Sequence, residues 1–314
     1  MRRADLLALA SAAAAYAAVP LPARAAAPLR VALAATDSSI LIPAADTFGY
    51  LSRVGLAVDT QFMSNGAATM AALLGGSIDL GATNSLSFLQ ARDKGLPLKI
   101  VAAQAIYRAG AASTALVTGK DSPLRTARDL TGKIVAVNGL GGSPHIAVKA
   151  WIDKNGGDAN AVRFVELAFP AMPMGLAGGR VDAAMIAEPA LSAALENGRL
   201  LGDAYGAIGP LWISDCIAAT ESWLDSHGDA ARGLSQALHA AAIWANRNHD
   251  KTADLAARTL KLDPLVVRTM RRAVFAETVT PRMMQPVIDA GVTYGALGKA
   301  QPAEDAFSRV ALWP

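Results

Sequence analysis

Charge and cysteine content narrow the possible functions of this 314-residue chain before any motif is considered. Its 29 basic and 26 acidic residues become 26 and 25 once the N-terminal Arg2, Arg3, Arg24 and Asp5 are set aside, and the remaining net charge of +1 leaves no electrostatic footprint for nucleic acid. The single cysteine, Cys216, excludes an internal disulfide and a multi-cysteine metal site, and the 4 histidines show no metal-ligand spacing.

The N-terminal segment has the three parts of a secretory signal peptide. Met1-Arg2-Arg3 is basic, residues 6–19 form a short apolar run, and residues 21–25 end on small side chains. We expect residues 1–27 to be removed, with cleavage near Ala25 to Ala27, by general or twin-arginine export. No cysteine follows that could carry a lipid anchor, so we expect a mature protein that is soluble in the periplasm.

A weak internal repeat, offset by 103 residues, indicates the architecture. Each matched segment is a strand-like apolar run or the Gly-Gly turn before one, and helical stretches lie between them. The matched pairs are residues 30–35 with 133–138, residues 57–62 with 161–166 after a one-residue slip, and residues 74–79 with 177–182. Two β-α-β-α-β units of this kind predict an α/β protein with two lobes, each a mostly parallel sheet with helices on both faces.

The chain after this repeat is predicted to be mostly helical and to return to the first lobe. Leu234, Leu238 and Ala242 recur at helical spacing, and Asp263-Pro264 is typical of a helix start. We therefore assign residues 28–112 and 215–314 to lobe 1 and residues 113–214 to lobe 2. The hinge would consist of the crossing segments 112–119 and 213–220.

Ligands of α/β sheets bind at the carboxyl ends of the strands, where helix N-termini leave backbone N–H groups unpaired. The repeat predicts which loops lie there: residues 36–39, 64–66 and 83–85 in lobe 1, and 138–143, 168–170 and 187–189 in lobe 2. Ser143 is expected as the cap of a helix whose first residue is Pro144. We expect Ser85 and Ser143 on opposite walls of one cleft, each at a helix start and each touching the solute.

Catalytic motifs are absent from these loops. The run Gly139 to Pro144 lacks the last glycine of a dinucleotide fingerprint and the lysine of a P-loop, although it could hold an anion. Ser85 and Ser143 lack the Gly-x-Ser-x-Gly context and an assignable His-Asp pair. Asp79 and Asp182 are expected to bond loop backbone. A periplasmic enzyme and the ligand-sensing subunit of a receptor system remain the alternatives to a binding protein.

Two segments carry a family resemblance: Asp129-Leu130-Thr131-Gly132-Lys133 and Gly179-Arg180-Val181-Asp182-Ala183. With the Gly-Gly-Ser-Ile-Asp turn at residues 75–79, the chain resembles the substrate-binding proteins of ABC importers of the nitrate/sulfonate/taurine type, a group that also includes thiamine-precursor binders. The resemblance implies a periplasmic-binding-protein fold that closes by a hinge on a small-molecule ligand. It further implies an importer permease with its ATPase subunits as partners. We expect no cofactor, no catalysis and a monomer.

The family's pocket loops fall on residues that agree with the predicted cleft: Ser38, Ser39, Asn65, Gly66, Asn84, Ser85, Gly142, Ser143 and Glu188. Those loops contain no Arg or Lys to pair with a strong anion, but Arg108 lies just beyond a predicted strand and could reach the cleft. Two ligand classes stay open. One is a sulfonate or carboxylate held by helix N-termini, and the other is a heteroaromatic compound held by Glu188 and Trp212.

Overall fold

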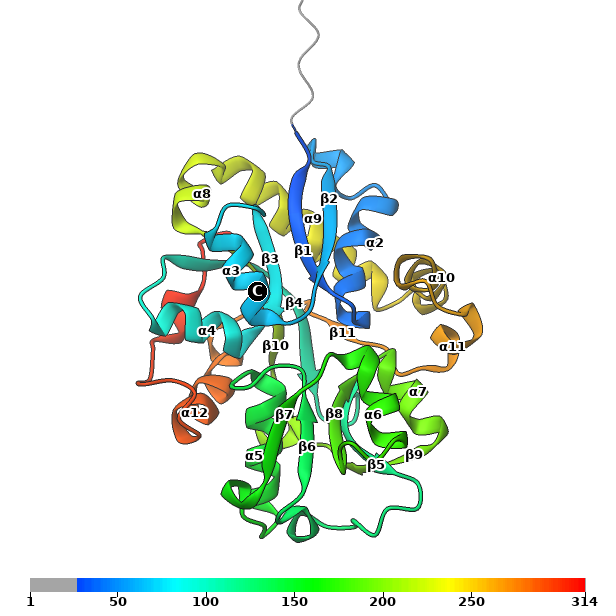
Figure 1. The fold of residues 1–314 in the computed structure, drawn as a ribbon. Coiled ribbons are helices and arrows are strands. Elements are labelled where there is room, and N and C mark those ends of the chain that lie inside the picture. The colour runs from blue at the N-terminus through cyan, green and yellow to red at the C-terminus, as the bar shows by residue number, and fades with distance from the viewer. Residues whose placement is uncertain (1–26, 314) are drawn as a thin grey trace, which may run out of the picture.

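Two β-sheets, each flanked by helices, make up the computed structural model, which describes residues 27–313 (Figure 1). Apart from Ala27, the predicted signal peptide lies outside these residues. Within the described range, no helix combines the length and the apolar character needed to span a bilayer.

The first sheet has six strands in the order β11-β4-β10-β3-β1-β2. Ten of the eleven residues of β4 are at least partly covered, and β3 is almost wholly buried, as expected for strands covered on both faces. The strands are β1 (Leu29–Ala34), β2 (Val58–Met63), β3 (Leu80–Asn84), β4 (Leu98–Arg108), β10 (Leu211–Thr220) and β11 (Val274–Phe275).

The second sheet has five strands in the order β7-β6-β8-β5-β9. Its central strand β8 is an unbroken buried run of small and apolar residues. The strands are β5 (Thr114–Gly119), β6 (Ile134–Val137), β7 (Arg163–Glu166), β8 (Ala183–Ala187) and β9 (Gly198–Gly202).

The predicted duplication is present in the fold. β1 pairs in parallel with β2 and β3, and β6 pairs in the same way with β7 and β8. An aspartate also occupies the same place in both units. Asp79 accepts from the backbone N–H of Arg30 at 2.8 Å, and Asp182 accepts from the backbone N–H of Ile134 at 2.8 Å. Both carboxylates therefore bond to strand backbone and join neighbouring strands, whereas the sequence predicted bonds to loop backbone.

Four of the six strands of the first sheet and four of the five of the second run in the same direction, as predicted, but antiparallel pairs interrupt both sheets. β10 runs antiparallel to β3 and β4, β11 is antiparallel to β4, and β5 is antiparallel to β8 and β9. The repeat covers only the three parallel strands of each sheet. The strands that it missed belong mainly to the segments by which the chain passes from one sheet to the other.

The chain crosses between the sheets at residues 109–113 and returns at residues 203–210. The crossings touch, because the N–H of Ala109 donates to the carbonyl of Pro210 at 2.9 Å. Residues 211–214, which the sequence assigned to lobe 2, belong to β10 and pair along the end of β4, with Trp212 opposite Tyr107. The predicted hinge segments are thus largely strand.

Helices pack on the faces of both sheets, and the C-terminal segment returns to the first sheet through β10 and β11 (Figure 1). The predicted apolar stripe of α9, which includes Leu234, Leu238 and Ala242, is buried, and Asp263 caps α11 by accepting from the N–H of Leu265 at 2.8 Å. The helix α12 contacts both α4 and α5, so the C-terminal segment touches both halves of the molecule. The helices are α2 (Leu41–Thr47), α3 (Gly66–Leu74), α4 (Ser85–Asp93), α5 (Ser143–Lys154), α6 (Met172–Ala177), α7 (Ala190–Glu196), α8 (Glu221–Ser226), α9 (Gly228–Ala245), α10 (His249–Leu260), α11 (Pro264–Thr269) and α12 (Gln285–Thr293).

Candidate functional site

A cavity of about 60 Å³ lies between the two sheets. Residues at the ends of β1, β3 and β8 line it, which is where the sequence placed the ligand loops. Its volume suits a few water molecules or one compact solute. Six of the predicted site residues line this cavity: Ser38, Ser39, Asn65, Gly66, Asn84 and Glu188.

Two asparagines shape the wall that comes from the first sheet. Asn65 caps α3 by accepting from the N–H of Ala68 at 2.9 Å, and Asn84 caps α4 by accepting from the N–H of Ser87 at 3.0 Å. Between them, Gly66 packs so closely on β3 that a Cβ atom would lie 2.4 Å from Thr83 Oγ1. Only glycine therefore lets α3 begin at this point of the wall.

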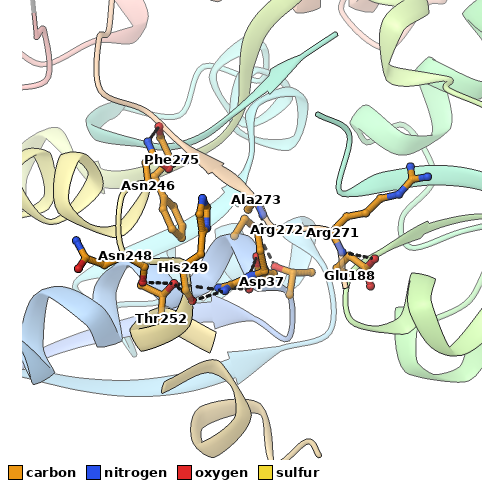
Figure 2. Close-up of polar contacts among 12 residues, drawn as sticks. Asp37, Glu188, Asn246, Asn248, His249, Thr252, Arg271, Arg272, Ala273 and Phe275 are labelled. Carbon is orange, nitrogen blue, oxygen red and sulfur yellow. Dashed lines mark hydrogen bonds and ion pairs between the residues drawn. The ribbon is translucent and has the colours of Figure 1, made fainter. Parts of the chain in front are cut away.

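A buried ion pair fixes the loop after β1 (Figure 2). Asp37 is 1% exposed and receives the guanidinium of Arg272, whose Nη2 lies 2.9 Å from its carboxylate. The N–H of Ala273 donates to the same carboxylate at 2.7 Å, and Nη1 of Arg272 donates to the carbonyl of His249 at 3.1 Å. Asp37 lines the cavity, but its charge is neutralised within the protein.

Glu188 lines the cavity from the second sheet. Its carboxylate accepts from the N–H and the hydroxyl of Ser192, both at 3.0 Å. It also accepts from the N–H of Arg271 at 3.2 Å (Figure 2). Burial raises the pKa of Glu188, and these hydrogen bonds act in the opposite direction. Glu188 therefore ties the second sheet to the segment before β11.

Two bulges in the long strand pair aim further polar groups into the cavity. Asp215 pairs with Ala105 and Cys216 pairs with Ala103, so Gln104 has no partner opposite it, and Ser214 is skipped on the other strand. Such bulges re-aim side chains beside functional sites. Ser214, Asp215 and Gln104 all line the cavity. Sequence analysis missed them, although a polar residue inside an apolar strand was the available signal.

Aromatic side chains form another part of the wall. Tyr107 and Tyr205 line the cavity with their ring centroids 5.9 Å apart, and Phe169 lines it from the second half of the molecule. The hydroxyl of Tyr107 donates to Asp203 at 2.7 Å, and burial raises the pKa of Tyr107. Burial also raises the pKa of Tyr205, and Asp215 adds to that shift. The tyrosines therefore remain neutral at physiological pH.

Five predicted site residues do not line the cavity, and their contacts explain why. Ser85 is fully buried and donates to the carbonyl of Ile213 at 2.7 Å. Arg108 is exposed and lines a second, more open pocket, which shares Ala111, Ala112 and Ala273 with the cavity wall. Trp212 lies behind Tyr205, to whose carbonyl its indole N–H donates at 3.3 Å.

The other two predicted residues, Gly142 and Ser143, lie where the two halves of the molecule touch in the closed state. Gly142 precedes α5, which begins at Ser143, one residue earlier than predicted. The N–H and hydroxyl of Ser143 both lie 3.2 Å from Oδ1 of Asn84, and the N–H of Leu86 donates to the same hydroxyl at 3.3 Å. Ser85 and Ser143 thus lie at helix starts on either side of one interface, but both bond to protein groups.

Groups on the two sides of the cleft bond to each other and to nearby backbone. Asp37 and Glu188 also meet across the cleft, where the N–H of Asp37 donates to the carbonyl of Glu188 at 3.1 Å. His145 accepts from the N–H of Gly141 at 2.9 Å, and burial lowers its pKa to about 4. Neither cleft serine has a basic partner, and Cys216 is buried.

Solved structures of three binding proteins share this fold over most of the chain. The alkanesulfonate-binding protein SsuA from Xanthomonas axonopodis pv. citri, bound to MOPS, is 23% identical with a TM-score of 0.74, over 90% of this chain and 98% of that one. The periplasmic aliphatic sulphonate binding protein SsuA from Escherichia coli is 22% identical with a TM-score of 0.72, over 89% and 97%. The periplasmic nitrate-binding protein NrtA from Synechocystis PCC 6803 is 14% identical with a TM-score of 0.76, over 90% and 86%. The predicted two-lobed periplasmic-binding-protein fold is confirmed.

Comparison with curated proteins by sequence gives no match. A family model described as NMT1/THI5 like, in contrast, matches residues 37–252. The matched segment runs from the loop after β1 into α10 and includes both crossings and most of the cavity wall. Because this segment is well over half of the chain and confirms the predicted resemblance, the chain belongs to the NMT1/THI5-like family.

Proposed function

We propose that this protein is the solute-binding component of an ABC importer. It would be exported to the periplasm by the signal peptide at residues 1–27, without a lipid anchor, and would act there as a monomer. It would capture a small solute and deliver it to a permease driven by ATPase subunits. The observation that carries the proposal is the polar cavity enclosed between two halves that are joined by two adjacent crossings.

The moving units in this proposal are the two lobes. The sequence divided the chain into lobe 1, residues 28–112 and 215–314, and lobe 2, residues 113–214. We move the second boundary to about residue 210, so that the whole of β10 belongs to lobe 1. Rotation about residues 109–113 and 203–210 would open the cleft. A solute that contacts both lobes favours the closed state, because it binds that state more tightly than the open one.

A binding role fits the cavity better than catalysis. The hydroxyls of Ser85 and Ser143 are engaged by Ile213 and Asn84, and His145 bonds within its own helix start. Nothing among these groups supplies the nucleophile and base that acyl transfer needs. We therefore propose that the protein turns over neither esters nor phosphates nor glycosides.

Native mass spectrometry of protein purified from the periplasm without denaturation tests the proposed function. We expect one small solute to be retained and to be removable by dialysis against denaturant. Adding the solute back should decrease the radius of gyration measured by small-angle scattering. At a solute concentration of about a hundred times the Kd, it should raise the free energy of unfolding by about 2.7 kcal/mol. Chemical conversion of the solute, or an unchanged radius at saturation, would contradict a closing binding protein.

We expect Ser143→Ala to favour the open state. The substitution removes the hydroxyl that Asn84 and Leu86 contact across the cleft, but it leaves lobe 2 intact. Loss of a neutral hydrogen bond costs about 0.5–1.5 kcal/mol, so the closed-to-open ratio should fall about 2- to 12-fold. Small-angle scattering of the ligand-free protein measures this change as a larger mean radius.

Ser85→Ala is the matched control for closure. Ser85 is equally buried and also begins a helix, but its hydroxyl bonds to Ile213 within the first sheet. The control should lower the free energy of unfolding by about 1 kcal/mol while the mean radius stays unchanged. Equal radii for both variants would show that the Ser143 contact does not hold the cleft closed.

A further inference from the structure

Asp215 differs from the other charged residues of the cavity wall within residues 27–313. Its carboxylate has neither a cation beside it nor several hydrogen-bond donors. Three carboxylates line the cavity: Asp37 is paired with Arg272, and Glu188 accepts three hydrogen bonds. Asp215 accepts only from the hydroxyl of Ser214, at 2.9 Å. No lysine, arginine or histidine of the described chain lines the cavity. A partly buried carboxylate with so few partners lacks hydrogen-bond donors.

Gln104 presents a second acceptor that lacks a donor. Its Nε2 donates to the carbonyl of Ser38 at 2.6 Å, which fixes the orientation of the amide. Its Oε1 is buried and has no hydrogen-bond partner among the described residues. Since most buried polar atoms in proteins are hydrogen-bonded, the missing partner of Oε1 is an N–H or O–H group.

These two acceptors lie side by side on neighbouring strands. Asp215 pairs with Ala105 and Cys216 with Ala103, so Gln104 stands at the level between them on β4. Neighbouring strands are about 4.8 Å apart, so two side chains that leave them toward the same cavity lie within reach of one ligand group. A single ligand group can therefore donate to both side chains.

The rest of the wall suits the small apolar body of such a ligand. Tyr107, Tyr205 and Phe169 line the cavity. A cation bound there would be attracted both by the carboxylate and by the faces of the aromatic rings. The small volume of about 60 Å³ favours a compact ligand in the closed state. An anion without N–H groups would instead bring its charge close to Asp215.

We propose that the cavity binds a compact primary amine or amidine, whose N–H groups donate to the carboxylate of Asp215 and to Oε1 of Gln104. This assignment rests on the proposed solute-binding function and names the chemical class of its ligand. It distinguishes this cavity from one that is built for a simple sulfonate or nitrate. A zwitterion such as taurine fits through its ammonium group.

Isothermal titration of the dialysed mature protein with five probes tests the assignment. Ethylammonium and acetamidine carry only N–H groups, ethanesulfonate and nitrate carry only anionic oxygen, and taurine carries both. We expect at least one of the N–H probes to bind, and Asp215→Asn to weaken it about 10- to 100-fold, as for a lost hydrogen bond to a charged group. Gln104→Met should weaken the same probe about 2- to 10-fold. The control Asp225→Asn removes an exposed carboxylate outside the cavity and should change nothing.

Several outcomes overturn this assignment. Binding of ethanesulfonate or nitrate that Asp215→Asn leaves unchanged or tightens would show an anion site, and the solute-binding function would stand. Binding of an N–H probe that is unaffected by Asp215→Asn would place the amine elsewhere. If no probe binds, the assignment fails, and the co-purified solute in native mass spectrometry decides the proposed function independently. Thermal unfolding of each variant verifies that the variant is folded.

Discussion

Replacement of Arg272 by methionine is expected to lower the free energy of unfolding by about 3–5 kcal/mol, because it strands a buried charge. The side chain of Asp37 is 1% exposed, and that of Arg272 is 12% exposed. Without the guanidinium, the carboxylate of Asp37 keeps only the N–H of Ala273 as a donor. The carbonyl of His249 and the hydroxyl of Thr252 would also each lose a donor. Urea unfolding at neutral pH measures the loss.

The neighbouring Arg271 provides the matched control. Its guanidinium points away from Asp37 in Figure 2, the residue is exposed, and its contact with Glu188 uses the backbone N–H, which Arg271→Met retains. The control should change the free energy of unfolding by less than about 0.5 kcal/mol. Equal destabilisation by both substitutions would mean that the ion pair with Asp37 contributes nothing specific. Because Asp37 lines the cavity, Arg272→Met should also weaken solute binding.

The strands that pair in parallel could be predicted from the sequence, and the antiparallel pairings could not. Buried apolar runs near Arg30, Val58 and Leu80 repeat after about a hundred residues, and this repeat indicated strands, helices and lobes together. The pairing of β4 with β10 joins segments that are more than a hundred residues apart. No periodicity within either segment specifies its partner, so the sequence placed a hinge where the structure has a strand.

The candidate site divides in the same way. Asn65 and Asn84 could be found because helix caps follow strands, and the ends of strands border the cavity. Asp215 and Gln104 were missed because they lie inside strands, where alternation alone cannot reveal a bulge. The usable signal was a carboxylate in the apolar run from Trp212 to Ala218, since burying a charge without a partner costs stability and so indicates a function.

Asp215→Asn is expected to raise the free energy of unfolding at about pH 7, the opposite of a typical substitution in a protein core. Burial raises the pKa of Asp215 from 3.8 to about 6, and the hydrogen bond from Ser214 acts in the opposite direction. Between these two pH values the folded state binds a proton that the unfolded chain has released, so stability falls as the pH rises. Above about pH 6 the whole cost of roughly 3 kcal/mol is present, and asparagine removes it.

The gain should vanish on acidification, because below about pH 4 the Asp215 carboxyl is neutral in both states and resembles the amide. The nearby Tyr205 and Cys216 titrate above this window, since burial raises the pKa of each. Asp79→Asn is the control of opposite sign: the hydrogen bond from Arg30 lowers the pKa of Asp79, so its stabilisation is present at neutral pH and is lost in acid. Urea unfolding of Asp215→Asn and of the unsubstituted protein between about pH 4 and 7.5 measures the first trend, and urea unfolding of Asp79→Asn below about pH 4 measures the second. If Asp215→Asn destabilises the protein at neutral pH, the protein itself supplies the hydrogen bonds that the Asp215 carboxylate needs. The carboxylate then has no unmet need for a ligand.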